Sequence, residues 1–349
     1  MRTPDAPRTR LWALDGLRGL AALAVVLYHY LYRARELYPE QLGAPSDWIQ
    51  WGSYGVQLFF LISGYVIFDS ARTSDQSRFL FNRAVRIYPA YWMCALITLV
   101  VVGLCGLAGR DSLTPLEQAI NFTLLQGFVG VPYIDGAWWT LTVELAFYAQ
   151  IAILARWGLL TGGRLIPTLF AWIFFLVSAR FVIVALDIDS VSHLSGVFYW
   201  GLTFVIGIAA NLALSGRRVA GIAVGSAALI GLLPGNLSIL VPMLVAISLL
   251  MLTVLVRLPS RWEKVGSYLG ELSYPLYLLH QNIGYVLLLA LAAAGVSRSL
   301  AVVATVVIVV SLATLIAYGA DVPLRRRLRA AYGRTRLRHT LNGRAEAID

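Results

Sequence analysis

Long apolar runs separated by short polar segments dominate the pattern of the chain. An α-helix needs about 20 mostly apolar residues to cross the hydrocarbon core of a bilayer. The runs that approach this length are 12–31, 52–70, 88–108, 137–155, 165–186, 195–213, 219–233, 237–256, 267–291 and 300–320. The pattern therefore predicts an all-α fold, a polytopic membrane helix bundle of about ten transmembrane helices. The seventh run is the shortest and ends in LLPGNLS, whose Pro-Gly-Asn is typical of a tight turn.

The composition agrees with a membrane protein and argues against other classes. Of the 349 residues 59% are hydrophobic and 13% are charged, whereas about a quarter of the residues in soluble domains are charged. The net charge of +10 could indicate nucleic-acid binding, but basic clusters between apolar runs more often set membrane topology. We therefore expect a lipid bilayer and no nucleic acid as a partner. Cys94 and Cys105 lie in one apolar run without metal-ligand spacing, so we expect neither a disulfide nor a metal site.

The arginine distribution predicts the orientation of the chain, because cytoplasmic loops carry an excess of Lys and Arg. With the N-terminus inside, the outer segments hold only Arg33, Arg35, Arg110 and Arg298. This distribution predicts both termini in the cytoplasm and a multi-pass protein of the cell membrane, inner or plasma. The first apolar run continues to about residue 31 without a small-residue cleavage site, so we expect a retained helix and not a signal peptide.

We expect one membrane domain, residues 10–325, followed by a basic cytoplasmic tail, residues 326–349, and no fused soluble domain. The largest predicted outer loops lie near 32–51 and 109–136. They are short, so the chemistry is expected within the membrane domain or at its edge.

Arg18 and His29 are ionisable residues within the first apolar run. Eleven positions along an α-helix correspond to about three turns and a rise of about 16 Å, so both side chains share one face at different depths. Ionisable groups in spanning helices usually face the bundle interior or an aqueous cavity. Histidine is a common general base for a hydroxyl, and arginine suits phosphate or carboxylate groups. The alternative is structural: Arg18 pairs with Asp15 or extends to the membrane interface, and His29 lies near the outer headgroups.

Two further segments carry charges that a membrane span must accommodate. Glu144 falls about seven residues into a predicted helix, at a depth that topology does not explain, and we expect it to contact His29 or Arg18. Arg83 and Arg86 precede Pro89 at the inner edge of a run, where they either set topology or bind phosphate.

The second and ninth runs are less decisive. Gly52, Gly55 and Gly64, with Ser63, permit close helix packing and need no other explanation. His280 lies midway through a helix that we expect Pro275 to break early. A buried histidine can be a purely structural residue. No internal repeat is visible in the sequence.

Taken together, these stretches resemble the acyltransferase 3 family of integral-membrane O-acyltransferases. The resemblance covers roughly residues 10–321 and is most specific between 14 and 148. It departs from the family pattern at Gln57, where many members have aspartate, and at Thr140, where serine is common. The matching features are Arg18 with His29, LFFLISG at 58–64, Arg83 and Arg86 before IYPAYW, WWTLTVELAFY around Glu144, and LSYPLYLLH ending at His280.

The resemblance implies transfer of an acyl group, commonly acetyl from acetyl-coenzyme A, to a hydroxyl of a carbohydrate or another acceptor. Acyl-CoA would be a co-substrate, and we expect no bound cofactor. The acceptor could be an exopolysaccharide, a lipid-linked glycan or a similar molecule. We expect catalytic residues His29, Glu144 and Arg18; acyl-CoA-binding residues Arg83, Arg86 and Arg18; and substrate-binding residues Ser63, Trp139, Tyr277 and His280.

Several alternatives stay open at the level of sequence. In the expected mechanism His29 is the general base and Glu144 orients it, but transfer through an acyl-His29 intermediate is also compatible with the residues. Ser63 is a weaker candidate nucleophile. A glycolipid or small-molecule transporter would also need polar residues inside a bundle, and a membrane haem protein could use His29 and His280 as axial ligands.

Overall fold

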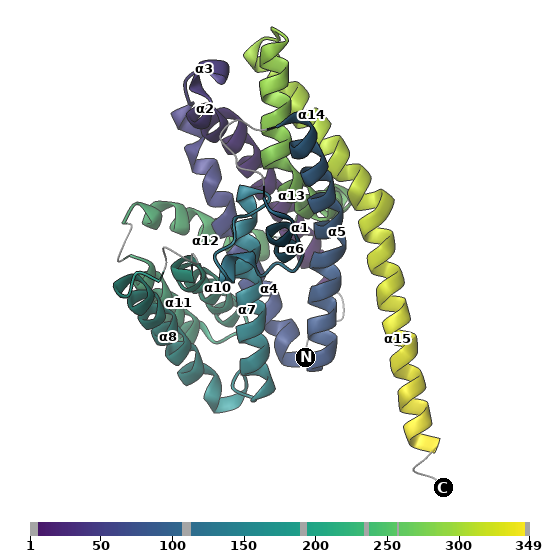
Figure 1. Ribbon diagram of the computed structural model, residues 1–349. Coiled ribbons are helices and arrows are strands. Elements are labelled where there is room, and N and C mark those ends of the chain that lie inside the picture. The colour runs from purple at the N-terminus through teal and green to yellow at the C-terminus, as the bar shows by residue number, and fades with distance from the viewer. Residues whose placement is uncertain (1–5, 107–112, 189–193, 234–236, 257, 346–349) are drawn as a thin grey trace.

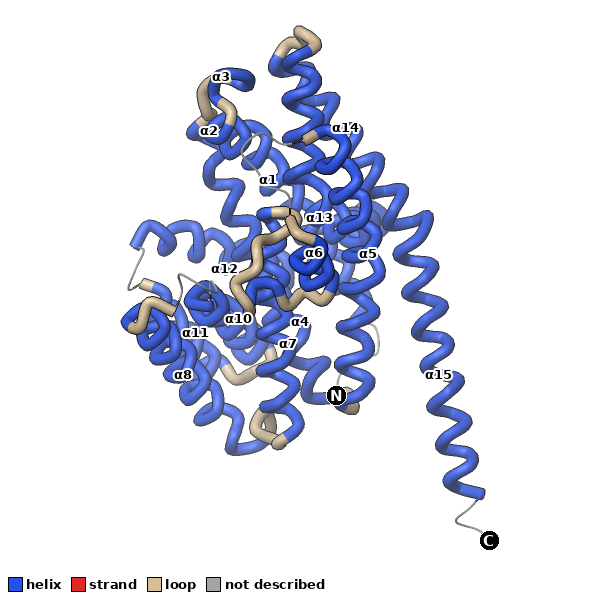
Figure 2. The backbone as a smooth tube through the Cα atoms, viewed as in Figure 1, coloured by secondary structure: helices blue, strands red, loops and turns tan. Residues whose placement is uncertain are grey.

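The computed structural model describes residues 6–106, 113–188, 194–233, 237–256 and 258–345. Within these residues the chain forms helices joined by loops and contains no strand (Figure 2). The predicted all-α fold is therefore confirmed.

Nine helical segments of the described chain are long and apolar enough to cross a membrane. The seventh predicted run, 219–233, is not among them, because it forms helix α11, Arg218–Leu232, of 15 residues, below the length of about 20 that a span requires. The helices of the nine segments are α1 Ala6–Tyr28, α4 Gly55–Thr73, α5 Gln76–Cys105, α7 Trp139–Arg156, α8 Leu165–Ala185, α10 Leu194–Leu214, α12 Leu240–Leu255, α13 Glu263–Ala293 and α14 Arg298–Ile316.

Short elements connect or extend these helices. A π-helical turn, His29–Arg33, follows α1, and another, Ala317–Asp321, follows α14. The remaining α-helices are α2 Ala34–Leu37, α3 Pro39–Leu42, α6 Pro115–Phe122 and α15 Val322–Ala345.

Pro275 does not break its helix, contrary to the sequence-based expectation. Helix α13 continues through this proline without interruption. Every residue from 272 to 280 is buried, and α13 packs against α1, α5 and α14. Proline is tolerated in a membrane helix when neighbouring groups satisfy the freed backbone atoms, so tertiary packing overrides the local preference here.

Helices α4 and α10 approach each other closely through two glycines. A Cβ atom on Gly64 would lie 2.0 Å from the carbonyl oxygen of Phe204, and one on Gly207 would lie 2.1 Å from that of Leu61. Both distances are far below van der Waals contact, so only glycine permits this helix spacing. The expected role of Gly64 in close helix packing is confirmed.

We predict that Gly64→Ala destabilises the protein, because the added methyl group forces α4 away from α10. Overpacking of this kind costs about 1–3 kcal/mol, and thermal unfolding in detergent should show a lower Tm. The matched control is Gly103→Ala in α5, where an added Cβ meets nothing within 4 Å. Equal melting temperatures for the two variants would contradict the close packing.

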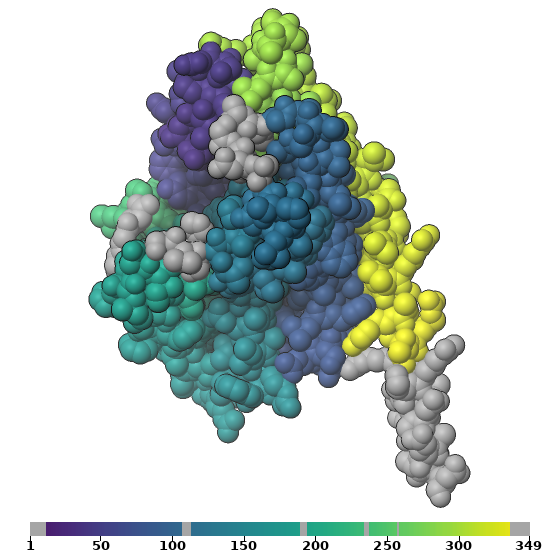
Figure 3. Space-filling model, viewed as in Figure 1, coloured from purple at the N-terminus to yellow at the C-terminus, as the bar shows by residue number. Residues whose placement is uncertain are grey.

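Helix α15 continues the chain beyond the last span and remains attached to the bundle. It runs down from the α13–α14 hairpin on the side of α5, and its last turns stand clear of the other helices (Figure 1). The yellow residues of α15 lie beside the blue surface of α5 (Figure 3). Near the middle of α15, the ring of Tyr332 stacks on Phe81 of α5 with centroids 4.1 Å apart. The segment predicted to be a basic tail thus begins inside a helix that packs on α5.

Candidate active site

Three cavities lie in a row through the helix bundle. We call them the arginine cavity, of about 360 Å³, the waist, of about 40 Å³, and the histidine cavity, of about 670 Å³. The arginine cavity and the waist share Arg18, Glu144 and Tyr274 in their walls. The waist and the histidine cavity share Val56 and Tyr277. The shared walls place the waist between the two larger cavities.

The arginine cavity has an excess of positive charge. Five arginines line it against three carboxylates, and Glu271 accounts for much of the pairing. Glu271 lies 3.6 Å from Arg86 and also forms an ion pair with Arg325. The buried Asp321 pairs with Arg325 at 2.8 Å. The charged lining residues are Arg18, Arg83, Arg86, Arg325, Arg329, Asp15, Glu144 and Glu271.

Arg18 and Arg83 form no ion pair with the described part of the chain. Their guanidinium groups lie 5.9 Å from the ring centroids of Phe59 and Tyr148, respectively. In both arginines the Nε atom is buried without a hydrogen-bond partner. The alternative pairing of Arg18 with Asp15 is therefore absent. Two unpaired guanidinium groups in one cavity suit a bound anion such as a phosphate.

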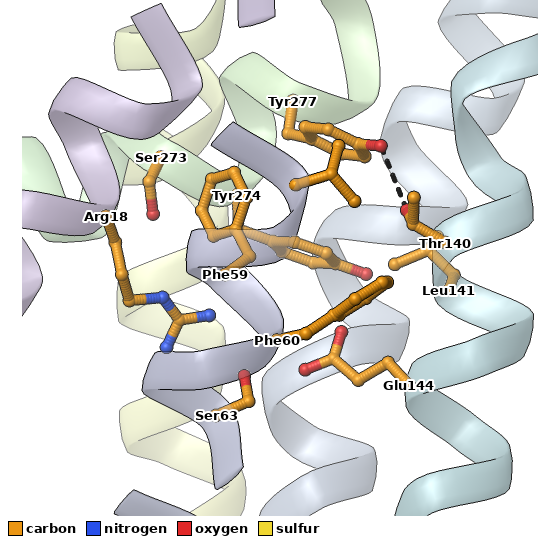
Figure 4. Close-up of a pocket in the computed structure, with 11 residues that line it drawn as sticks. Arg18, Phe59, Phe60, Ser63, Thr140, Leu141, Glu144, Ser273, Tyr274 and Tyr277 are labelled. Carbon is orange, nitrogen blue, oxygen red and sulfur yellow. Dashed lines mark hydrogen bonds between the residues drawn. The ribbon is translucent and has the colours of Figure 1, made fainter. Parts of the chain in front are cut away.

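The waist is a narrow passage between four helices (Figure 4). Arg18 of α1, Ser63 of α4 and Glu144 of α7 extend into the same space, and aromatic rings form much of its wall. The hydroxyl of Thr140 donates to that of Tyr277 over 3.0 Å, which links α7 to α13. The aromatic residues are Phe59, Phe60, Tyr274 and Tyr277.

Glu144 lies away from the histidine that it was expected to orient. Its carboxylate accepts a hydrogen bond from the Tyr148 hydroxyl one turn further along α7. Glu144 lines the waist and the arginine cavity but not the histidine cavity. Of its two expected partners, it therefore shares a cavity with Arg18 and not with His29.

His29 occupies the first position of the π-helical turn after α1 and lines the histidine cavity. Its Nδ1 atom lies 2.9 Å from the Val25 carbonyl oxygen and 3.2 Å from Nε2 of His280. Irregular π-turns within helices are frequent at functional sites. The two imidazole rings meet edge to face, with centroids 4.6 Å apart. Axial haem ligands stand on opposite sides of a porphyrin, so this direct contact does not fit the haem alternative.

The four residues expected to bind the substrate lie in three different places. Trp139 and Tyr277 line the histidine cavity, and Ser63 lines the waist. His280 is fully buried and lines none of these three cavities. The structure thus brings Trp139 and Tyr277 into one cavity with His29, whereas His280 lies behind it.

Hydrogen bonds that the sequence did not indicate hold α13 behind His29. The Tyr30 hydroxyl donates to the His280 carbonyl over 2.9 Å, and Trp138 Nε1 donates to the Leu278 carbonyl over 3.1 Å. The buried Asp135 accepts from the Asn282 backbone N–H over 2.9 Å. Two polar residues in the sequence could have indicated this contact: Asp135, just before a predicted span, and Asn282, within another.

The sequence motifs also did not indicate Arg325 and Arg329, which line the arginine cavity. Asp321 and Arg325, four residues apart after the last apolar run, could have indicated an ion pair on a continuing helix. The cavity that α15 helps to enclose depends on tertiary packing, which the sequence pattern does not show.

The fold and the cavities together define an integral membrane protein in which an arginine-lined cavity and a cavity lined by a half-buried histidine lie on either side of a narrow waist. A family profile described as an acyltransferase domain matches residues 11–319. The chain belongs to this family, which is the family that the sequence motifs resemble.

Several curated proteins are similar to the chain. It is 29% identical over 318 residues to the exopolysaccharide production protein ExoZ of Rhizobium meliloti, covering 84% of this chain and 95% of the relative. It is 33% identical to the acyltransferase MdmB of Streptomyces mycarofaciens, over 42% of this chain and 40% of the relative. Nodulation protein 10 of Rhizobium leguminosarum bv. viciae is 31% identical, over 45% and 48%. The match thus spans less than half of the last two relatives. No solved structure matches the chain.

Proposed function

We propose that the protein is an acyl-CoA-dependent O-acyltransferase that acylates a hydroxyl group of a carbohydrate. The observation that carries this proposal is the row of cavities, which joins unpaired arginines at one end to His29 at the other. The similarity to a relative named for exopolysaccharide production supports a polysaccharide or a lipid-linked glycan as acceptor. Acetyl is the proposed acyl group.

The arginine cavity is the proposed site for the phosphate groups of coenzyme A. Arg83 and Arg86 would bind them at the membrane edge that the arginine distribution predicts to be cytoplasmic, with Arg18 deeper along the path. Arginine matches phosphate geometry through paired N–H donors. The pantetheine arm would pass Glu144 and Ser63 in the waist and deliver its thioester to the histidine cavity.

His29 is the proposed general base in the histidine cavity. It would take the proton of the acceptor hydroxyl as that oxygen attacks the thioester carbonyl carbon. The carbon–sulfur bond then breaks, the acceptor keeps the acyl group as an ester, and His29 returns the proton to the thiolate of coenzyme A. Trp139 and Tyr277 line the same cavity and are the proposed contacts of the acceptor.

In this scheme Glu144 and Arg18 act at the waist on the acyl donor. Both face the passage of the pantetheine arm, and neither contacts His29. Their role in the reaction is to bind and position the donor.

Acyl transfer in isolated membranes tests the proposal. Membranes that contain the protein are supplied with radiolabelled acetyl-coenzyme A and a mixture of glycans, and membranes that lack it serve as the control. We expect protein-dependent label in an alkali-labile ester on glycan. Label that stays on the protein would indicate an acyl-enzyme intermediate, and its loss in His29→Ala but not in Ser63→Ala would place that intermediate on His29. Protein-dependent movement of glycan across the membrane without any transfer of label would overturn the proposal in favour of a transporter.

A further inference from the structure

His280 lies behind His29 with its ring fully buried. We infer that His280 is a positioning residue: it accepts a hydrogen bond from Nδ1 of His29 and so presents Nε2 of His29 to the histidine cavity as the basic nitrogen. This inference rests on the proposed acyl transfer and specifies which atom accepts the proton. In this assignment His280, and not Glu144 as expected, orients the imidazole ring of His29.

The contacts of His280 determine where its own proton lies. Its Nδ1 atom is 2.7 Å from the carbonyl oxygen of Tyr277. A carbonyl oxygen can only accept, so Nδ1 of His280 carries the hydrogen. In the neutral ring, Nε2 of His280 then has a free electron pair, and this atom faces His29 at 3.2 Å.

The contacts of His29 complete the assignment. Its Nδ1 atom faces two acceptors, the Val25 carbonyl oxygen at 2.9 Å and Nε2 of His280. Nδ1 must therefore carry the hydrogen of the neutral His29 ring. The opposite arrangement, with His280 donating, would place the electron pair of His29 Nδ1 against the Val25 oxygen.

Nε2 of His29 is consequently the atom that can accept a proton. None of the described residues forms a hydrogen bond with it, and it is not among the buried atoms without a partner. Because His29 lines the histidine cavity, a substrate hydroxyl can reach this nitrogen. When Nε2 gains the proton, the Nδ1–H bond to His280 becomes charge-assisted and roughly doubles in strength.

The position of His280 is itself fixed by neighbouring elements. The Tyr30 hydroxyl donates to its carbonyl oxygen, and its ring packs 5.3 Å from that of Tyr277. These contacts hold the acceptor nitrogen in place without a carboxylate. A histidine pair thus takes the place of the histidine–carboxylate pair found in many hydrolases.

Two substitutions separate the hydrogen bond to His29 from packing. Gln at position 280 can place its amide oxygen near the position of Nε2 and so still accept from His29. Asn can still donate to the Tyr277 carbonyl, as Nδ1 does, but its side chain is too short to reach His29. We expect His280→Asn to lower kcat at least about tenfold with KM for acetyl-coenzyme A unchanged, and His280→Gln to retain most of the wild-type kcat. Equal loss in both folded variants would overturn the inference.

A second measurement does not depend on activity. The chain has four histidines, so ¹⁵N-histidine NMR of the protein in nanodiscs gives few ring signals, and His29→Ala identifies those of His29. We expect a hydrogen on Nδ1 and none on Nε2 in the wild type, and a shifted Nδ1 resonance in His280→Asn, where the Val25 carbonyl alone accepts from this atom. A hydrogen on Nε2 of His29 in the wild type would overturn the inference. The expected tautomer without any acyl transfer would instead overturn the proposed function and leave the hydrogen-bond assignment standing.

Discussion

Replacing His29 by alanine is expected to lower kcat for acyl transfer by about a hundred- to ten-thousandfold, the usual cost of losing a general base. Among the described residues no carboxylate or second histidine lines the histidine cavity, and Nδ1 of His280 is engaged by the Tyr277 carbonyl. Steady-state transfer of radiolabelled acetyl groups at equal protein level measures the effect. KM for acetyl-coenzyme A should change little, since the proposed phosphate contacts lie in the arginine cavity.

His339→Ala is the matched control for this substitution. Position 339 lies in α15, beyond the last residue of that helix that lines the arginine cavity. We expect wild-type transfer in this variant. If His29→Ala retains more than about a tenth of the wild-type kcat, His29 is not the base.

Replacing Arg83 by alanine is expected to raise KM for acetyl-coenzyme A by about ten- to a hundredfold. Arg83 forms no ion pair in the described residues, so its removal leaves no carboxylate unpaired and acts on the ligand alone. A hydrogen bond to a charged group contributes about 1.5–3 kcal/mol, which corresponds to this range of affinity. Kinetics at varied donor concentration separate KM from kcat.

Arg78→Ala in the same helix is the control, because Arg78 is exposed and does not line the arginine cavity. Arg83→Lys should give an intermediate KM, since lysine keeps the charge but loses the paired donors. A fall in kcat at unchanged KM would contradict a donor-binding role for Arg83.

The membrane fold was predictable because its main signal is local. Apolar length and arginine distribution act over one segment at a time, and nine of the ten predicted runs became helices of spanning length. The path of α13 through Pro275 was not predictable, because it depends on burial against three other helices.

The candidate site was predictable in part for a similar physical reason. The spacing of Arg18 and His29 follows from one helix, and the structure places them in different cavities of one row, as their different depths predict. The partner of His29 comes from α13, more than 200 positions away in sequence. The partner of Glu144 is Tyr148 on its own helix. Contacts between charged groups on different helices depend on how the helices pack. The sequence pattern alone does not predict them.

The size of the waist has a consequence for the membrane as a whole. A passage through a bilayer that opens to both sides would conduct ions and dissipate the proton gradient. The waist has about 40 Å³ between aromatic rings and the side chains of Arg18 and Glu144, room for only a few water molecules, and a passage of this size restricts the flow of hydrated ions. In the proposed reaction, a flexible acyl arm that fills this constriction would keep it sealed, so that the acyl group would cross the barrier while the barrier stayed closed to ions.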